Sequence, residues 1–496
     1  MNAILAMALA LAGQGTAAEP AAKDQEDARK RVREIFKDDY AKKLPADVRA
    51  FAQKLLKQGQ ENKGDIPLTF VLLREAREKA VDALDPSLAL EAVEVAARTF
   101  AISAIEQKGE ALDRIQRRTT ALEALDALLS AYLAVVAEAV SADRYEEALK
   151  LFPGAEAVAA RVDPLWAVEL KARKRDVDAV GREYKLVKKH VDALKVNADD
   201  VEANLAVGKF LCFVRNDFKA GIPLLAKGSD KTLQVLAEAE LGQLSDAVSF
   251  ADIGDRWYEL AKGYSGGKFE KRFHDRAFFW YDRAWPKMTG LARVEFEKRL
   301  TEREERYGKV NLLRLIDSET DSRPLREDPK APYIWKMQDG VLYAPSLAGM
   351  AQLDVPYQLP ADYDLEITLE FVGNRGSDLF YVFPPSAEGR CIGFQGGYER
   401  GTHRIGESSK ALELPGPGEK GRLTSRAPLF KNGAIAQLVF SFRGGSVTVT
   451  SDNRTILMSP GKFTTPKGKS TLVLGCYSAQ YKIHALKVSP PGKRTR

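Results

Sequence analysis

Two patterns of hydrophobic residues divide the chain near residue 320. Before that point hydrophobic residues recur every three or four positions, as Val32, Phe36 and Tyr40 do, which predicts amphipathic helices. After it they alternate with polar residues, most clearly over residues 363–371, which predicts β-strands. The pattern therefore predicts a multidomain α-then-β fold, with an array of α-helical hairpins followed by an antiparallel β-sandwich of the jelly-roll type.

The length agrees with several domains. A chain of 496 residues is too long for one compact core. A stretch rich in charge and proline separates the two patterns and predicts a linker. The expected organisation is a signal peptide at 1–18, a helical repeat array at 19–316, a linker at 317–332, a β-sandwich at 333–490 and a basic tail at 491–496.

In the helical half, small residues and aromatic residues recur at a spacing that resembles the tetratricopeptide repeat over roughly residues 140–290. The residues that carry the resemblance are Gly208, Ala220 and Leu224; Trp257, Leu260, Ala261, Tyr264, Ala277, Tyr281 and Ala284; and Tyr145, Ala148 and Phe152. Ala277 comes roughly four residues late for this repeat, and Pro153 is expected to end its helix early. Residues 165–195 are expected to form one long helix. The resemblance implies a scaffold that binds peptides or proteins.

The β half carries a second resemblance, over about residues 330–490. The segments that carry it are Trp335, 339–342 and 359–371, with the hairpin at Gly444 and Gly445. They resemble the concanavalin A-like lectin/glucanase fold, and most of all the bacterial domain of 3-keto-disaccharide hydrolases and laminin-G-like modules. This fold carries lectins, hydrolases and adhesion modules alike, so the resemblance implies a fold rather than an activity. With the helical array and an export signal, the chain also looks like secreted proteins of planctomycete-type bacteria.

One strand carries the candidate catalytic carboxylates. Asp364, Glu366 and Glu370 share one face of the predicted strand at 363–371. A retaining glycosidase needs two carboxylates about 5 Å apart, one as acid and one as nucleophile. The glucanases of this fold place them as Glu-x-Asp-x-x-Glu, and the order and spacing here differ. A polar, solvent-facing strand is therefore favoured over a catalytic pair.

A binding site for a sugar is better supported than a catalytic one. Aromatic rings stack on sugars, and planar polar side chains pair with hydroxyl groups. The stretches 375–381 and 394–400 offer both kinds of group beside glycines. The candidate ligand-binding residues are Asp378, Tyr381, Gln395, Tyr398 and Arg400; the alternative is that they are core aromatics and turn residues.

Charge and composition limit the partners. The net charge is +6, and the charges are spread along helices, so no nucleic-acid partner is expected. The most apolar stretch, 121–140, contains Glu123, Asp126 and Glu138 and predicts a buried helix rather than a transmembrane segment.

Cysteine and histidine positions point to no cofactor. The four histidines are scattered and no cysteine pair has metal-ligand spacing, so neither a metal site nor another cofactor is expected. Cys391 and Cys476 both lie in predicted strands. A disulfide between them is one alternative, and three buried thiols, with Cys212, are the other.

The first eighteen residues have the pattern of an export signal. An apolar run at 3–12 is too short to span a bilayer, and small residues precede Glu19, so cleavage after Ala18 is expected. No Lys or Arg precedes the run. The alternative is an Ala-rich N-terminal helix; export would place the protein in the periplasm or outside the cell.

These observations favour a secreted, non-catalytic binding protein in which the sandwich recognises a glycan and the helical array serves as a scaffold. One alternative is a glycoside or 3-keto-disaccharide hydrolase with Glu366 or Glu370 as the acid. Another is a protein–protein scaffold in which the helical array binds a partner and the sandwich is a structural cap.

Overall fold

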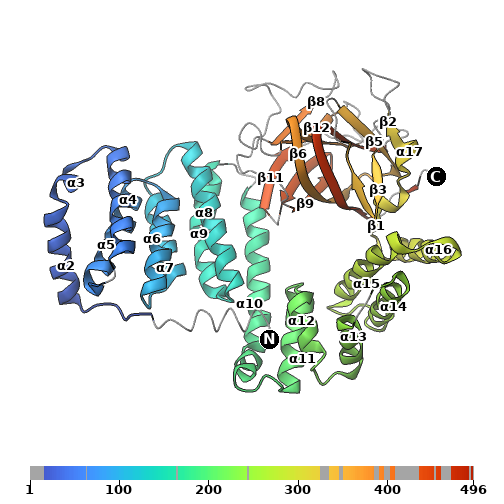
Figure 1. Ribbon diagram of the computed structural model, residues 1–496, viewed down its shortest axis with the longest axis horizontal. Coiled ribbons are helices and arrows are strands. Elements are labelled where there is room, and N and C mark those ends of the chain that lie inside the picture. Colours follow the sequence, from blue (N-terminus) through green and yellow to red (C-terminus); the bar gives the residue numbers. More distant parts are fainter. Residues whose placement is uncertain are drawn as a thin grey trace. The chain divides into compact units, whose positions relative to one another are not determined.

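In the computed structural model the chain folds into two compact units, Met1–Glu238 and Ala239–Arg496 (Figure 1). It describes residues 16–62, 64–162, 166–242, 245–323, 335–345, 350–384, 390–395, 403–407, 435–451, 454–459, 471–490 and 493–494. The largest buried cluster of the first unit runs from Ala28 to Val177, and that of the second unit runs from Val310 to Val488. The predicted boundary between array and linker, at residue 316, thus falls inside the second unit.

The first unit is a succession of helices joined by short turns. Its helices are α2 (Ala22–Ile35), α3 (Lys37–Ala41), α4 (Pro45–Glu61), α5 (Ile66–Asp82), α6 (Pro86–Thr99), α7 (Ala104–Gln116), α8 (Leu122–Ser141), α9 (Tyr145–Val162), α10 (Trp166–Val196), α11 (Val201–Lys209), the π-helical η1 (Phe210–Val214), α12 (Phe218–Leu225) and α13 (Lys231–Leu241), in which the first unit ends. Helices α2 to α10 stand side by side (Figure 1). The long helix predicted at 165–195 is α10.

Aspartates fix the starts of several helices. The side chains of Asp65 and Asp85 accept hydrogen bonds from the backbone N–H groups of Leu68 and Leu88, at 2.9 and 3.0 Å. A proline lies at the first or second helical position of both α5 and α6, where its missing N–H costs nothing. Such N-caps satisfy N–H groups that the helix itself leaves free, and each contributes about 1 kcal/mol.

Neighbouring helices approach closely where one of them carries glycine. A Cβ atom added to Gly59 of α4 would lie 2.6 Å from the Leu73 side chain of α5, and one added to Gly181 of α10 would lie 2.8 Å from Tyr145 of α9. With contacts this short, a larger residue would force the neighbouring side chain to shift. These glycines therefore set the spacing of the helix pairs.

Helix α9 corrects one prediction. Pro153 was expected to end this helix, but the helix continues to Val162 with the proline inside it. A proline inside a helix costs about 3 kcal/mol, because it removes one hydrogen bond and crowds the preceding turn. Phe152, Ala155 and Val158 on either side of it are fully buried. Their burial outweighs that cost and holds the helix together.

Helix α8 has the composition of a membrane span. Within the described residues, the window Ala124–Ser141 alone is long and apolar enough, with a mean hydropathy of 1.6, and 44% of it is buried in the fold. Leu128 and Tyr132 are fully buried in the core of the first unit. The inward face of this apolar helix is thus buried, as expected from the sequence.

The second unit begins with helices that pack on one another. They are α14 (Ala247–Gly263), α15 (Glu270–Ala284), the 3₁₀-helix η2 (Trp285–Lys287), α16 (Gly290–Tyr307), the 3₁₀-helix η3 (Leu312–Leu315) and α17 (Ser318–Asp321). A Cβ atom added to Gly254 of α14 would lie 2.4 Å from the ring of Tyr281 on α15, which is fully buried. The tyrosine ring fills the space that this glycine leaves between the two helices.

An antiparallel β-sandwich follows. Its strands are β1 (Val310–Asn311), β2 (Ser322–Arg323), β3 (Lys336–Gln338), β4 (Val341–Tyr343), β5 (Met350–Gln358), β6 (Tyr363–Phe383), β7 (Arg390–Gln395), β8 (His403–Glu407), β9 (Ile435–Arg443), β10 (Ser446–Ser451), β11 (Arg454–Ser459), β12 (Thr471–Ser489) and β13 (Lys493–Arg494). The predicted change from helices to strands, and the predicted fold class, are confirmed.

Two long strands, β6 and β12, run through both layers of the sandwich. The first half of β6 pairs with β9 and with the second half of β12, giving the order β11-β10-β9-β6-β12-β4-β3. The second half of β6 pairs with β7 and with the first half of β12, which also pairs with β5. Shifts in register between Tyr477 and Tyr481 mark the place where β12 passes from one layer to the other.

The segment before the predicted linker belongs to the sandwich. In strand β1, Val310 pairs with Val488 and Asn311 with Lys487 of β12. Leu312 and Leu313 are buried in the same cluster as the strand residues. The sandwich therefore includes residues that the helical pattern assigned to the array.

Candidate ligand-binding face of the sandwich

Strand β6 separates the core of the sandwich from a polar outer face. Leu365, Ile367 and Leu369 are at most 1% exposed and lie in the core. The alternate residues Asp364 and Glu370 are partly exposed on the other side. This alternation confirms the predicted orientation of the strand.

A row of outward-facing residues crosses five strands of this face. The pairing of the strands places Lys336 of β3 beside Tyr343 of β4, Tyr343 beside Lys482 of β12, Lys482 beside Glu370 of β6, and Glu370 beside Ile435 of β9. Directly opposed residues of an antiparallel pair project to the same side of the sheet. These five residues, here called the cross-strand row, therefore line one continuous strip. Ile435 is 57% exposed, so the strip is open to solvent at that end.

Glu370 is the centre of the polar contacts in the row. Its two oxygens lie 2.9 Å from Nζ of Lys482 and 2.7 Å from Nε2 of His484. The hydrogen bonds from Lys482 and then His484 hold the pKa of the Glu370 carboxyl below its usual range. Glu370 is thus a carboxylate acceptor near neutral pH, not a proton donor.

His484 owes its position to a β-bulge. The pairing of β12 with β6 shifts from Ile483 opposite Leu369 to Ala485 opposite Thr368, so His484 is the extra residue. A bulge redirects a side chain without ending the strand. The imidazole, 31% exposed, reaches Glu370 from this bulge.

An aromatic ring lies beside these polar groups. Nζ of Lys482 lies 5.8 Å from the centre of the Tyr343 ring, within the range of a cation–π contact. The half-buried Tyr343 has exposed Lys336 on its other side. The strip thus combines a ring face with hydrogen-bonding groups, as a sugar-binding surface requires.

The other candidate carboxylates also form ion pairs. Glu366 lies 2.7 Å from Nζ of Lys309, and both oxygens of Asp364 lie 2.8 Å from one guanidinium nitrogen of Arg443. A catalytic acid must keep its proton near the working pH, usually in an apolar pocket that raises its pKa. Glu366 and Asp364 each accept from a neighbouring cation instead.

One end of this face is covered and the other is open. Lys487 of β12 pairs with Asp282 of α15, and Lys309, just before β1, pairs with Glu366. Residues from the helical part of the second unit therefore occupy the face around Glu366 and Lys487. The cross-strand row lies beyond this covered end.

The predicted ligand-binding residues lie mostly outside the part of the chain that the structure describes in full. Asp378 lies in β6 and Gln395 in β7, where the backbone but not the side chain is described, and Tyr398 and Arg400 lie outside the described residues. Gln395 is opposite Leu379, so β6 and β7 bring the two predicted stretches together as neighbours. The side chain of Tyr381 is only 2% exposed and offers little surface to a sugar.

The cross-strand row was not found from the sequence. Alternation within β12 marks Lys482, between buried Tyr481 and Ile483, and His484, after Ile483, as outward-facing. This alternation shows which face of the strand each side chain occupies, but not which residues of other strands lie beside it. More than a hundred residues separate Glu370 from Lys482 and His484, and the pairing of distant strands is not encoded in local spacing.

Thiols and metal-binding groups complete the description of the site. Cys476 is a free, buried thiol, and burial raises its pKa to about 12. Cys212 is also buried. Within the described ranges, no three His, Cys, Asp or Glu side chains converge as metal ligands would.

Comparisons with known proteins find only a limited likeness between part of this chain and several solved structures. No family model matches the chain, and no curated protein sequence is similar to it. Three similar solved structures are the galectin LEC-6 of Caenorhabditis elegans (16% identity, 28% of this chain and 89% of that one, TM-score 0.21), the carbohydrate-binding module CBM66 of Bacillus subtilis (9%, 37% and 95%, 0.24) and the carbohydrate recognition domain of Emp46p (12%, 37% and 96%, 0.27). At these identities and TM-scores, no function is transferred from them.

Proposed function

We propose that the protein binds a glycan through the outer face of its sandwich and does not cleave it. The observation that carries the proposal is the cross-strand row, in which Tyr343 lies between two lysines and the second of them, Lys482, pairs with Glu370. A sugar ring placed on Tyr343 would have cationic donors and a carboxylate acceptor within reach of its hydroxyl groups.

The state of the carboxylates supports binding rather than hydrolysis. Asp364, Glu366 and Glu370 all accept hydrogen bonds or ion pairs from cations. In such surroundings they orient donors and accept from hydroxyl groups. The hydrolase alternative requires a carboxyl that holds its proton, and the lowered pKa of Glu370 argues against that role for this residue.

Binding of the full-length chain to soluble neutral and uronic-acid polysaccharides tests the proposal. Replacing Tyr343→Ala is expected to weaken binding roughly two- to tenfold, equivalent to about 0.5–1.5 kcal/mol of lost ring contact. Thr450→Ala is the matched control, because Thr450 lies on β10 of the same layer, away from the row. Binding to none of the polysaccharides, or equal binding by both variants, would overturn the assignment of this face.

A measurement of the reducing ends released from the polysaccharides distinguishes hydrolysis from binding alone. No release is expected from the unmodified chain. Release that disappears in Glu370→Gln or Glu366→Gln would replace the binding proposal with the catalytic one. The control Thr450→Ala should have no effect in this assay either.

We further propose that the chain is exported, on the pattern of its first eighteen residues. Ala17 exchanges backbone hydrogen bonds with Thr99 and Ala101, at 2.8 and 2.9 Å, which cleavage after Ala18 would remove. Mass measurement of the protein isolated from its own cells tests the site. A mature chain beginning at Glu19 is expected, and an intact leader would contradict export by this route.

A further inference from the structure

A basic cavity lies between helices α2 and α5 of the first unit. Its volume is about 440 Å³, and side chains of both helices line it. Its charged lining residues are Arg29, Lys30, Arg33 and Arg74, with Glu26 as the single carboxylate. The lining therefore carries an excess of positive charge in a space of ligand size.

The cavity is built from one face of each helix. Arg29 and Arg33 are four residues apart on α2 and so project from the same side. Arg74 comes from α5, where its Nη1 donates to Oε1 of Gln25 at 2.9 Å. Gln25 is itself fixed, because its amide nitrogen donates to the carbonyl oxygen of Pro20 at 2.8 Å. A neutral amide thus positions the Arg74 guanidinium without neutralising it.

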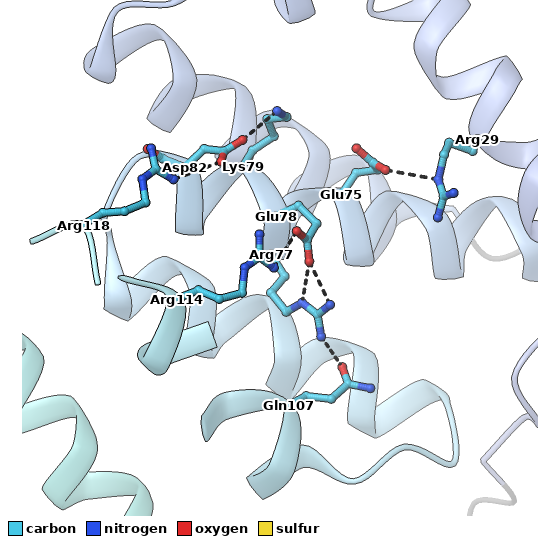
Figure 2. Close-up of polar contacts among 9 residues, drawn as sticks. All are labelled: Arg29, Glu75, Arg77, Glu78, Lys79, Asp82, Gln107, Arg114 and Arg118. Atoms are coloured by element: carbon cyan, nitrogen blue, oxygen red, sulfur yellow. Dashed lines mark hydrogen bonds and ion pairs between the residues drawn. The ribbon is translucent and has the colours of Figure 1, made fainter. Parts of the chain in front are cut away.

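The carboxylates of α5 already have other partners (Figure 2). Glu75 lies 3.4 Å from Nε of Arg29 and accepts a hydrogen bond from the hydroxyl of Tyr40. Glu78 pairs with Arg114 of α7 at 2.7 Å and with Arg77 at 2.8 Å. These pairs tie α5 to α2 and α7.

Two cations of the cavity lack such a partner. Among the residues that the structure describes, neither Arg33 nor Arg74 forms an ion pair with a carboxylate. Burial, followed by the nearby guanidinium groups of Arg29 and Arg77, lowers the pKa of Arg74. A half-buried cation beside other cations is a position that an anion would stabilise.

We propose that this cavity binds a tetrahedral oxyanion, the phosphate or sulfate group of a larger ligand. A carboxylate could be matched by one guanidinium, whereas a group with three or more acceptor oxygens uses donors from several directions. Arg29, Arg33 and Arg74 supply those donors from two helices. The site is independent of the sandwich and of its proposed glycan.

Calorimetric titration of the full-length chain with inorganic phosphate and with inorganic sulfate, at constant ionic strength, tests the proposal. Saturable binding of at least one anion is expected. Arg74→Gln should weaken it roughly ten- to a hundredfold, as for the loss of a hydrogen bond to a charged group. Tighter binding of phosphate would indicate a phosphorylated ligand, and tighter binding of sulfate a sulfated one. No saturable binding of either anion would overturn the proposal.

A matched variant separates the cavity from overall charge. Lys23→Gln also removes one positive charge from α2, but Lys23 is exposed and does not line the cavity. Its affinity for the anion should equal that of the unmodified chain. Equal weakening by Lys23→Gln and Arg74→Gln would show only a general charge effect and would refute the site.

The stability of Arg74→Gln gives a second readout. Replacing Arg74 removes its hydrogen bond to Gln25 but also relieves its burial beside the guanidinium groups of Arg29 and Arg77, so the stability of the anion-free chain should change only slightly. The stabilisation that added anion gives the unmodified chain should be lost. A variant that is markedly less stable without anion would assign Arg74 a structural role and contradict the proposal.

Discussion

Replacing Glu304→Gln should strongly destabilise the second unit. Glu304 and Arg314 form an ion pair in which both side chains are 2% exposed. The second carboxylate oxygen accepts a hydrogen bond from the backbone N–H of Asn311 at 2.9 Å. Glutamine keeps the shape of the side chain but leaves the guanidinium buried without a counter-charge.

The size of the effect follows from that burial. Removing one partner of a buried pair costs about 3–5 kcal/mol, because the remaining charge stays out of water. In the described part of the chain Nε of Arg314 already has no hydrogen-bond partner, so little else there compensates the guanidinium. At roughly 2–4 °C per kcal/mol for a unit of this size, the melting temperature should fall by about 6–20 °C.

Urea unfolding followed by tryptophan fluorescence measures the loss in free energy of unfolding, and thermal unfolding measures the fall in melting temperature. The control is Glu305→Gln, which removes the same charge from the exposed neighbour on α16 and should change stability by at most about 0.5 kcal/mol. The double variant Glu304→Gln with Arg314→Met should recover most of the loss, because no buried charge remains. Equal stability of the two glutamine variants, or no recovery in the double variant, would refute the reasoning.

Two further predictions concern packing and pH. Gly254→Ala should destabilise the second unit by about 1–3 kcal/mol, because the new methyl group would meet the Tyr281 ring. Gly263→Ala on the same helix meets nothing within 4 Å and should stabilise the unit by up to about 1 kcal/mol. Urea unfolding compares the two variants, and equal effects would contradict the close approach of Gly254 to Tyr281. The hydrogen bond from Lys482 lowers the pKa of Glu370, so its contribution to stability is fully present above the unfolded pKa near 4.5 and is lost as pH falls through the lower folded pKa. The stability difference between the unmodified chain and Glu370→Gln should therefore be larger at neutral pH than at about pH 3; an unchanged difference would show that the contacts of Glu370 do not favour its charged form.

Much of the fold could be predicted because it depends on local spacing. The three- to four-residue period before residue 320 and the alternation at 363–371 each identify a face that must be buried. Strand β1 was not predicted, because its two residues, Val310 and Asn311, are too few to show a period. The helix end predicted at Pro153 was wrong, because the cost of a proline inside the helix is outweighed by the burial of the residues around it.

The candidate site could not be predicted in the same way. Alternation places Glu370 and Lys482 on outward faces but does not show that they are neighbours. Their pairing depends on which strands lie side by side, and their register on a bulge at His484. The basic cavity could not be predicted for a similar reason, because Arg74 and Arg33 come together only when α2 packs against α5.

The passage of β6 and β12 through both layers has a consequence for how the sandwich reaches its native alignment. If β12 slid by one residue along β6, every side chain of that strand would turn over, in both layers at the same time. Leu474 and Leu486, which belong to different layers, would be expelled from the core together. An error in strand alignment is thus penalised twice, so misaligned intermediates should be short-lived during folding.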